Sequence, residues 1–317
     1  MSTFKILTTL DFSTCPDALD VFHGLGEVTV LPWDYDAVFE VIGDYDAYLA
    51  STSVVVDAAL VEKGKKLKVI GSPATGTDHL DIGAIDAAGI TRFDIAKEFD
   101  LIRSFTATSE LAFALLLGLN RRLVEAVSAT RNGDWAREQF SGFQLQGKTF
   151  GILGLGRLGT ISARIARGFG MNVIACDVCD DAVASGVERV TFDELFVRSD
   201  VVSIHVHLDH TTRGLVDDRA LQLMKPSAIL LNTARGAIVD ETALLNALRA
   251  KRLAGAGIDV IEGEWLKDIL VHPLVQYSRE NENLLITPHI GGATFESINQ
   301  ARIFMAKKVA DYLREKA

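Results

Sequence analysis

The chain has 317 residues, which is enough for two domains rather than one. Hydrophobic residues make up 48% and charged residues 23%, a balance typical of a soluble globular protein with an ample core. The formal net charge of −10 argues against nucleic acid or an anionic membrane as a partner, because both favour surfaces rich in Lys and Arg.

Apolar segments and cysteines indicate a cytoplasmic protein. The longest apolar run expected to be helical, residues 111–119, falls short of the roughly 20 residues that span a bilayer, and the N-terminus lacks the layout of a signal peptide. Three cysteines, an odd and small number, fit a reducing compartment. Cys176 and Cys179 form a CxxC, but no second Cys or His pair stands at metal-binding spacing, so we expect no metal site there.

Short apolar segments alternate with helical or turn segments through the first hundred residues. Strands are expected at 5–7, 28–31, 47–49 and 67–70, with helical or turn segments at 16–22 and 57–63. From residue 148 the alternation returns, with strands expected at 148–153, 173–176, 201–204 and 228–231. Strands that alternate with helices predict parallel sheets covered by helices on both faces.

Three further segments are not part of this alternation. A long helix is expected from residue 106 to about 129, because leucines recur at i+4 steps. These are Leu111, Leu115, Leu119 and Leu123. The polar segment 132–147 is interpreted as an arm that packs on another subunit or as a surface loop. The last segment, 293–317, is expected to be one amphipathic helix.

A glycine-rich turn follows the strand expected at 148–153 and precedes a helix expected at 160–169. Gly154 permits a tight turn, Gly156 lets the backbone approach a pyrophosphate, and Gly159 lets the helix pack closely on the sheet. The helix N-terminus stabilises the phosphate charge. The motif therefore predicts a Rossmann-type dinucleotide site. The residues that it assigns to the cofactor are Gly154, Gly156, Arg157, Leu158 and Gly159.

An acidic residue ends the next expected strand, as this kind of nucleotide site requires. Asp177 is expected to accept hydrogen bonds from the ribose hydroxyls of the adenosine, and its charge would repel a 2′-phosphate. Asp180 and Asp181 follow it, and no Arg or Lys stands close behind it. The sequence therefore favours NAD over NADP.

Three later motifs, at 231–240, 257–264 and 285–294, read LNTARGAIVD, GIDVIEGE and LITPHIGGAT. They resemble the D-isomer-specific 2-hydroxyacid dehydrogenase family, which includes phosphoglycerate, glycerate and D-lactate dehydrogenases. The resemblance covers essentially the whole chain. It implies an NAD-dependent enzyme that moves a hydride between nicotinamide and C2 of a small D-2-hydroxy acid or 2-keto acid.

The resemblance also implies a catalytic set. Arg235 is the candidate that orients the substrate and polarises its C2 oxygen, because a guanidinium forks onto planar carboxylate or carbonyl groups. His289 matches the catalytic histidine, which moves the hydroxyl proton. Glu264 falls at the family's catalytic acid, and a nearby carboxylate fixes a histidine tautomer and favours its protonated form. Trp265 replaces the usual proline, and Glu262 competes for the role, but spacing favours Glu264.

Other positions are assigned to ligands through the same resemblance. Asp259 is expected near the nicotinamide end of the cofactor, and Thr233 is assigned to the cofactor as well. His205 is expected to support the cofactor pocket rather than to act in catalysis. Backbone N–H groups around Thr75 and Gly76 are expected to hold the substrate carboxylate.

The architecture implied is α/β with two doubly wound domains. A Rossmann NAD-binding domain at 101–289 is inserted in a flavodoxin-like substrate domain made of 1–100 and 290–317. A homodimer is expected from the family and from the arm at 132–147.

Uncharged residues replace two arginines that phosphoglycerate-type members carry, which favours a substrate without phosphate, such as a keto sugar acid, glycerate or glyoxylate. They are Ala50 and Ser72, although Arg92 and Arg103 offer other positive charges. The alternatives are a phosphoglycerate dehydrogenase, a non-catalytic NAD(H)-sensing binding protein, and a formate or phosphite dehydrogenase.

Overall fold

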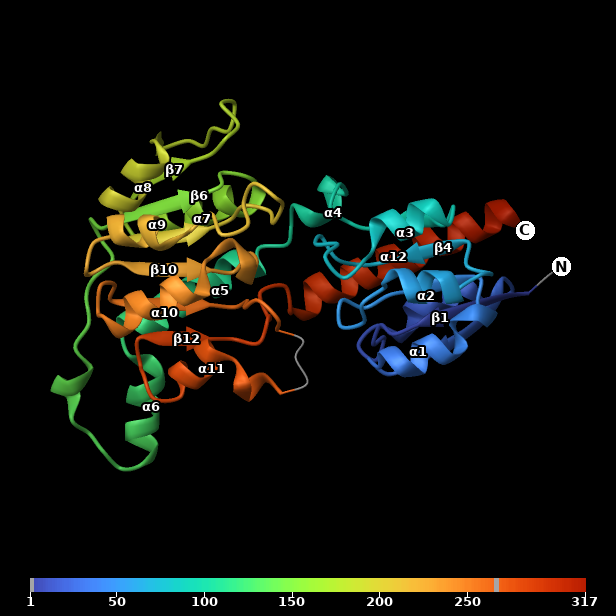
Figure 1. Cartoon of the computed structure of the whole chain (residues 1–317), viewed down its shortest axis with the longest axis horizontal. Helices are drawn as coiled ribbons and strands as arrows, with labels where there is room; N and C mark the ends of the chain where they lie inside the picture. The colour runs from blue at the N-terminus through green and yellow to red at the C-terminus, as the bar shows by residue number, and fades with distance from the viewer. Residues whose placement is uncertain (1–2, 265–267) are drawn as a thin grey trace. The chain divides into compact units, whose positions relative to one another are not determined.

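The computed structural model describes residues 3–264 and 268–317, and the chain divides into two compact units (Figure 1). Unit 1 holds the chain up to Phe105 and again from Ala293 onward, and unit 2 holds Thr106–Gly292. The chain therefore leaves unit 1, builds all of unit 2 and returns. The domain boundaries expected from the sequence, 100/101 and 289/290, lie five and three residues from these two crossings.

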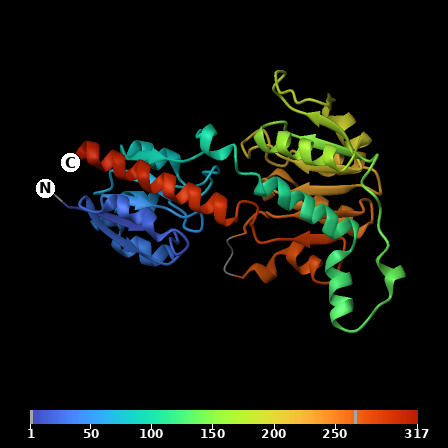
Figure 2. The same cartoon turned by 180° about the vertical axis from the view of Figure 1, so that it is seen from behind.

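Unit 1 contains a parallel five-stranded sheet of order β2-β1-β3-β4-β5, which is the flavodoxin-like order. Its strands are β1 Phe4–Thr8, β2 Gly26–Val30, β3 Ala47–Leu49, β4 Val69–Gly71 and β5 Thr91–Phe93. Its helices are η1 Pro16–Phe22, α1 Tyr35–Val41, η2 Ile42–Asp44, α2 Ala58–Lys63, α3 Ile82–Ala87, α4 Phe99–Ile102 and α12 Phe295–Lys316. The predicted tail helix is confirmed as α12, which lies along the unit 1 sheet (Figure 2). Its buried side chains belong to the same apolar core as Phe4, Ile6 and Val69 of the sheet.

Unit 2 contains a parallel seven-stranded sheet of order β12-β11-β10-β9-β6-β7-β8, the Rossmann order with one strand added. Its strands are β6 Thr149–Leu153, β7 Asn172–Cys176, β8 Val187–Arg189, β9 Val201–Ile204, β10 Ile229–Asn232, β11 Gly255–Ile258 and β12 Leu284–Ile286. The order reverses between β6 and β9, and ligands of such sheets bind beyond the carboxyl ends of the strands at this point.

The helices of unit 2 cover both faces of its sheet. They are α5 Ala107–Asn120, α6 Leu123–Arg131, η3 Arg137–Phe140, α7 Arg157–Gly168, α8 Phe192–Arg198, α9 Asp218–Leu223, η4 Gly236–Ile238, α10 Glu241–Arg249, η5 Ile269–Val271 and α11 Pro273–Ser278. Each of the eight strands expected from the sequence begins and ends within two residues of an observed strand. The two doubly wound α/β sheets that the sequence predicted are confirmed.

The prediction of one helix from 106 to about 129 is wrong. The helix breaks at Arg122, whose backbone is left-handed with φ 46°, and α6 starts afresh after it. The leucine repeat continues across the break, but the leucines before and after it differ in burial. Leu115 in α5 is buried, whereas Leu123 is exposed and α6 buries none of its residues. The leucine repeat therefore indicates a buried helix in α5 but not in α6. The α7 helix also begins three residues earlier than predicted, at Arg157.

One helical stretch, 99–120, is long and apolar enough to cross a membrane by length and composition, which the sequence reasoning overlooked. In the structure this stretch is the separate helices α4 and α5. Figure 2 shows α5 lying across the face of the unit 2 sheet. The side chains of Ala112, Phe113 and Leu116 in α5 are buried. This burial is that of a core helix packed on a sheet.

Candidate active site

The glycine-rich turn joins β6 to α7. Two of its glycines, Gly154 and Gly159, have no space for a side chain. Gly154 has φ 97°, and a Cβ there would lie 2.8 Å from Val206 Cγ1. A Cβ on Gly159 would lie 2.1 Å from the carbonyl oxygen of Gly154. The first glycine therefore makes the turn, and the third lets α7 pack directly against it.

Gly156 differs from both, since a Cβ there would meet no atom of the described residues within 4 Å. It is the N-cap of α7, and no side chain caps the helix. The space beside the Cα atom of Gly156, at the start of this 12-residue helix, is therefore open. A diphosphate suits this position, because it accepts hydrogen bonds from the first N–H groups of a helix and its charge is stabilised by the helix dipole. The turn fits the pyrophosphate of a dinucleotide.

Asp177 follows β7 and ties the turn to the end of that strand. Its Oδ2 accepts the Leu155 N–H at 2.6 Å and its Oδ1 accepts the Cys179 N–H at 2.8 Å. Each carboxylate oxygen keeps further acceptor capacity, which suits ribose hydroxyls. Sequence reasoning missed Arg189 on the adjacent strand β8. Its guanidinium donates to the carbonyl oxygens of Asp177, Cys179 and Ala182, so it supports this strand end through long-range strand pairing.

Two further predicted cofactor residues follow β9 and β10 at the same edge of the sheet. Thr233 is buried, and its hydroxyl has no hydrogen-bond partner among the described residues. An unpaired buried hydroxyl is costly, so a bound polar group at this position would stabilise it. His205 donates its backbone N–H to Leu153, and its Nε2 lies 2.9 Å from Ser203 Oγ. Burial lowers the pKa of His205 to about 4, so the ring is neutral at physiological pH.

The low pKa of His205 predicts a loss of stability in acid. The unfolded chain binds the proton at the ordinary value of 6.5 and the folded protein only near 4, so stability falls as pH drops through this window. At pH 5 the loss is about 2 kcal/mol. His205→Gln should narrow the difference in unfolding free energy between pH 7 and pH 5 by this amount in urea denaturation. The exposed His207→Gln serves as control, and an equal difference in both variants would contradict the prediction.

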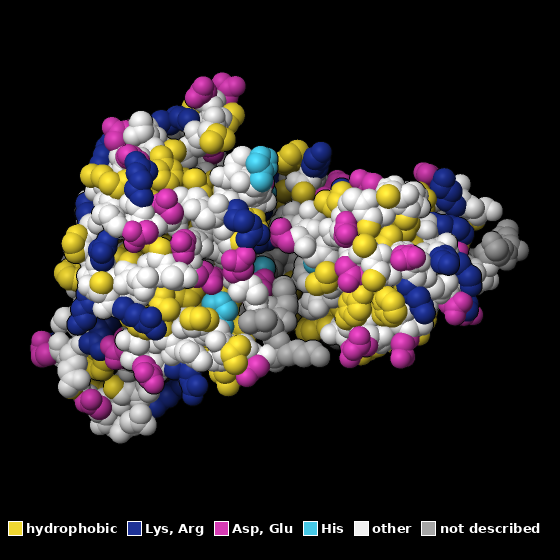
Figure 3. Space-filling view, in the orientation of Figure 1, with side chains coloured by type: hydrophobic (Ala, Val, Ile, Leu, Met, Phe, Trp, Pro, Cys, Tyr) yellow, Lys and Arg dark blue, Asp and Glu magenta, His cyan; other side chains and the backbone are white. Residues whose placement is uncertain are grey.

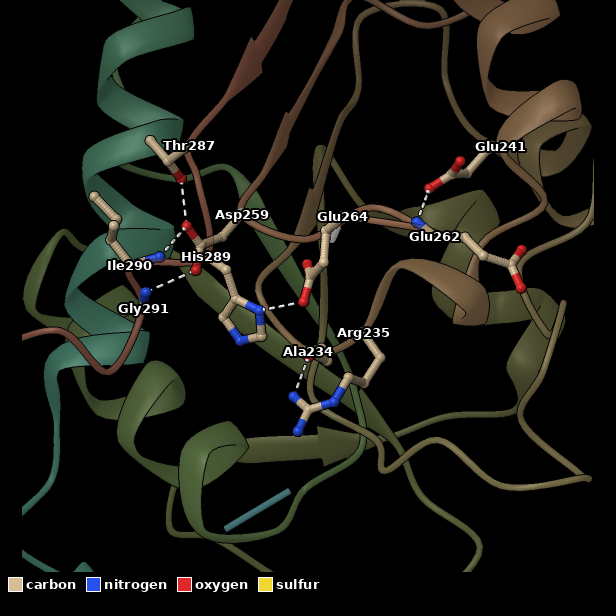
Figure 4. A network of polar contacts seen from close by, with 10 residues as sticks. All are labelled: Ala234, Arg235, Glu241, Asp259, Glu262, Glu264, Thr287, His289, Ile290 and Gly291. Atoms are coloured by element: carbon tan, nitrogen blue, oxygen red, sulfur yellow. Dashed lines mark hydrogen bonds and ion pairs between the residues drawn. The ribbon is translucent and has the colours of Figure 1, made fainter. Parts of the chain in front are cut away.

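The predicted catalytic side chains come from the ends of three neighbouring strands. Arg235 follows β10, Glu264 follows β11 and His289 follows β12. Figure 4 shows the three side chains converging. His289 Nδ1 lies 2.6 Å from Glu264 Oε1. His289 has a left-handed backbone with φ 53°, which is uncommon for a residue other than glycine and recurs at functional sites.

Asp259 binds the loop that carries His289 through several hydrogen bonds. Its carboxylate accepts the Thr287 hydroxyl at 2.5 Å and the backbone N–H groups of Ile290 and Gly291 at 2.9 and 2.7 Å. Its carbonyl oxygen accepts the His289 N–H at 2.9 Å. Only 1% of Asp259 is exposed. The structure thus assigns Asp259 to the support of His289, while its predicted contact with the cofactor stays a prediction.

The geometry separates the two glutamates that competed for the catalytic position. Glu262 Oε1 lies 2.6 Å from Arg213 Nη1 and points away from His289 (Figure 4). Glu264 is the one whose carboxylate contacts the imidazole. The structure therefore favours Glu264 over Glu262. Trp265, which replaces the usual proline, lies outside the described residues.

Gly236 explains why a glycine follows Arg235. A Cβ on Gly236 would lie 2.2 Å from the carbonyl carbon of Ile261 and 2.3 Å from the Glu262 nitrogen, so the two loops touch through their backbones. Asn232 holds the other side, since its Nδ2 donates to the Arg235 carbonyl oxygen at 2.9 Å. The Arg235 Nη1 donates to the Ala234 carbonyl at 2.7 Å. The guanidinium is thus carried on a tightly packed turn.

The predicted substrate loop in unit 1 follows β4. The Ser72 hydroxyl and His79 Nε2 lie 2.9 Å apart and are buried, which fixes the two ends of the loop. Among the described residues, the backbone N–H groups of Thr75 and Gly76 donate to no protein acceptor. Two such N–H groups can bind a carboxylate, and this role stays a prediction.

A dinucleotide turn and a histidine–carboxylate pair at the carboxyl edge of one Rossmann sheet are the arrangement of a nicotinamide-dependent dehydrogenase. The cofactor residues fit NAD, because the open cradle at Gly156 and the acid at Asp177 match its pyrophosphate and its unmodified ribose.

Comparisons with known proteins agree with this class. The model of the D-isomer specific 2-hydroxyacid dehydrogenase NAD binding domain matches residues 113–291. A glyoxylate reductase of Thermococcus litoralis is 38% identical over 286 residues, covering 87% of this chain and 82% of the relative. A D-3-phosphoglycerate dehydrogenase of Methanocaldococcus jannaschii is 34% identical over 303 residues, covering 94% of this chain but 56% of the relative.

A solved structure shows the same fold with its ligands. The D-lactate dehydrogenase of Aquifex aeolicus, complexed with NAD and lactic acid, has a TM-score of 0.81 and 25% identity, covering 98% of this chain and 96% of that one. The chain belongs to the D-isomer-specific 2-hydroxyacid dehydrogenase family. It is an NAD-dependent oxidoreductase that interconverts a 2-hydroxy acid and the matching 2-keto acid, which confirms the predicted reaction class and cofactor.

Proposed function

We propose that the substrate is a small unphosphorylated 2-keto acid, or the D-2-hydroxy acid that it yields, and that Arg235, Glu264 and His289 carry the reaction. The observation that carries this proposal is the convergence of these three side chains, with His289 Nδ1 2.6 Å from Glu264. Relatives named glyoxylate reductase and hydroxypyruvate reductase support a substrate of this size.

The contact with Glu264 determines which nitrogen of His289 exchanges a proton with the substrate. Nδ1 donates to the Glu264 carboxylate, so Nε2 is the nitrogen left to exchange a proton with the C2 oxygen. Glu264 stabilises the imidazolium, and Arg235 binds the carboxylate or C2 oxygen through its paired N–H groups. NAD supplies or accepts the hydride at C2 when it is bound. Asp259 keeps His289 in place through the loop that it binds.

The charges in unit 1 favour a substrate without phosphate. Ala50 and Ser72, the positions where phosphoglycerate-type members carry arginines, are uncharged and fully buried. The two other arginines considered are paired with carboxylates, Arg92 with Asp94 and Arg103 with Asp100. Ala50 and Ser72 therefore offer no positive charge to a phosphate, and the charge of the largely buried Arg92 is balanced by Asp94.

NADH absorbance with a panel of 2-keto acids tests the proposal. The panel holds glyoxylate, hydroxypyruvate, keto sugar acids and phosphohydroxypyruvate, with Arg235→Ala measured alongside. We expect turnover of an unphosphorylated acid that the variant loses. Efficient turnover of phosphohydroxypyruvate would overturn the substrate proposal and favour a phosphoglycerate dehydrogenase.

Formate or phosphite oxidation and NAD(H) sensing have their own readouts in the same assay. If the protein oxidised formate or phosphite with NAD, that compound rather than a 2-keto acid would be its substrate. NADH binding without turnover of any panel member would favour the NAD(H)-sensing role. The hydrogen bonds that fix the half-buried His205 and the loop of His289 favour catalysis over sensing, because they hold both rings at the carboxyl edge of the sheet.

We propose a homodimer that is formed through α6 and the segment 132–147. Both extend away from the unit 2 sheet (Figures 1 and 2), and α6 buries none of its residues in the single chain. Large apolar side chains are exposed along them, namely Leu123, Val124, Val127, Trp135 and Phe143. Such a patch on a soluble protein indicates an interface. Light scattering at micromolar concentration should give twice the mass of 34.4 kDa, and a monomer would contradict it.

We further propose that the enzyme acts in the cytoplasm with no nucleic-acid or membrane partner. On the face seen in Figure 3, Lys and Arg are interspersed with Asp and Glu rather than gathered in one basic patch, and the net charge is −10. The three cysteines are unpaired thiols, which suits a reducing compartment. Cell fractionation tests this location, and recovery in the membrane fraction would contradict it.

A further inference from the structure

A second histidine–glutamate pair lies in unit 2 and has no part in the proposed chemistry. Glu241 is the first residue of α10, and His272 is the N-cap of α11. His272 Nε2 lies 3.2 Å from Glu241 Oε2, and the two side chains are only 7% and 18% exposed. Burying such a pair is costly unless its remaining hydrogen bonds are made. The partners of these two side chains therefore show what the pair does.

Both side chains contact the backbone of one residue, Glu262. The Glu262 N–H donates to Glu241 Oε1 at 2.7 Å, and the Glu262 carbonyl oxygen lies 3.1 Å from His272 Nε2. The carbonyl can only accept, so Nε2 carries the proton. His272 Nδ1 in turn accepts the Leu274 N–H, which fixes the same tautomer. The pair thus holds Glu262 by its N–H and by its carbonyl oxygen.

The held backbone leads directly to the catalytic carboxylate. Glu264 stands two residues after Glu262 and contacts His289. In Figure 4, Glu241 lies on the side of Glu262 away from His289. The side chain of Glu262 adds little support, because its partner Arg213 is 58% exposed and a surface ion pair contributes little.

We propose that Glu241 and His272 are positioning residues for Glu264, which they hold against His289 through the backbone of Glu262. This inference rests on the proposed roles of Glu264 and His289. A displacement of about 1 Å at a reacting group lowers a rate by up to roughly a hundredfold, so the effect of losing either side chain falls on kcat. Binding of NADH and of the keto acid depends on other residues and should change little.

Four variants test the inference on the preferred keto acid of the panel. Glu241→Ala should lower kcat by about tenfold or more, with KM and the NADH Kd within about threefold of the original protein. His272→Asn keeps the N-cap acceptor for Leu274 but does not reach Glu262, and should act in the same direction. Glu241→Gln keeps an acceptor for the Glu262 N–H and should restore most of kcat. Arg213→Ala is the control and should leave kcat within about threefold.

NADH titration counts the folded sites, so kcat is compared per binding site. Wild-type kcat in both Glu241→Ala and His272→Asn, whatever their Tm, would overturn the inference and leave only a structural role. If Glu241→Ala does not fold, His272→Asn decides by itself. Glu264→Gln, measured in the same assay, distinguishes a failure of the proposed role of Glu264 from a failure of this inference. An unchanged kcat there contradicts the proposed role of Glu264, whereas a large loss there with none in the positioning variants overturns this inference alone.

Discussion

His289→Asn is expected to lower kcat for keto-acid reduction by about 10²- to 10⁴-fold, while the Kd of NADH stays within about threefold. The imidazole is the only group in the proposed set that gives a proton to the C2 oxygen, and Asn at this position has none to give. Asn also tolerates the left-handed backbone found at φ 53°, so the loop should keep its shape. Steady-state kinetics and NADH fluorescence titration measure the two quantities.

The exposed His210→Asn is a matched control for this change and should leave kcat unaltered. Glu264→Gln should lower kcat as well, and the double variant should be little slower than His289→Asn, since the pair acts as one unit. Additive losses would show that the carboxylate acts apart from the imidazole. A kcat that survives His289→Asn would assign proton transfer to another group.

Alanine at the second and third glycines of the nucleotide turn should separate cofactor binding from folding. A Cβ on Gly159 would lie 2.1 Å from the Gly154 carbonyl oxygen, so α7 must move. We expect Gly159→Ala to lower the free energy of unfolding by about 3 kcal/mol and to abolish NADH binding. A Cβ on Gly156 meets no described atom within 4 Å, so Gly156→Ala should change stability by less than about 0.5 kcal/mol.

The new methyl group in Gly156→Ala enters the space in which we place the pyrophosphate. Its NADH Kd should therefore rise by about tenfold or more, equivalent to about 1.4 kcal/mol. Urea denaturation and fluorescence titration distinguish the two variants. Unchanged NADH affinity in Gly156→Ala would place the pyrophosphate elsewhere, and an unchanged unfolding free energy in Gly159→Ala would mean that α7 packs more loosely than the structure shows.

Features carried by short runs of residues were predictable from the sequence. The glycine turn and the strands around it have local causes, because strand burial and tight turns depend on neighbouring residues. The three catalytic candidates also emerged, because each lies in a motif that resembles one of the family's. Parallel strands bring such ends to one edge of a sheet, which is why residues distant in sequence meet at His289.

Features that depend on distant packing were not predictable. The helix break at Arg122 lies in an unbroken leucine pattern, and only the loss of a core beneath α6 separates the two helices. The hydrogen bonds of the Asp259 carboxylate to the loop that carries His289 join two strand ends distant in sequence, while the expected position of Asp259 near the cofactor stays a prediction. The Glu241–His272 pair left no signal, because its two residues come from different helices and act on a backbone rather than on a ligand.

The return of the chain to unit 1 has a consequence for biosynthesis. Unit 2 is one uninterrupted segment, whereas unit 1 is completed by α12, which is synthesised after all of unit 2. Met305 and Val309 of α12 lie so close to Gly71 that a Cβ there would come within 2.8 Å of both. The apolar face that they cover stays open until α12 has been synthesised. The segment with the cofactor turn and the proton-transfer pair can therefore fold while its companion still awaits its final helix.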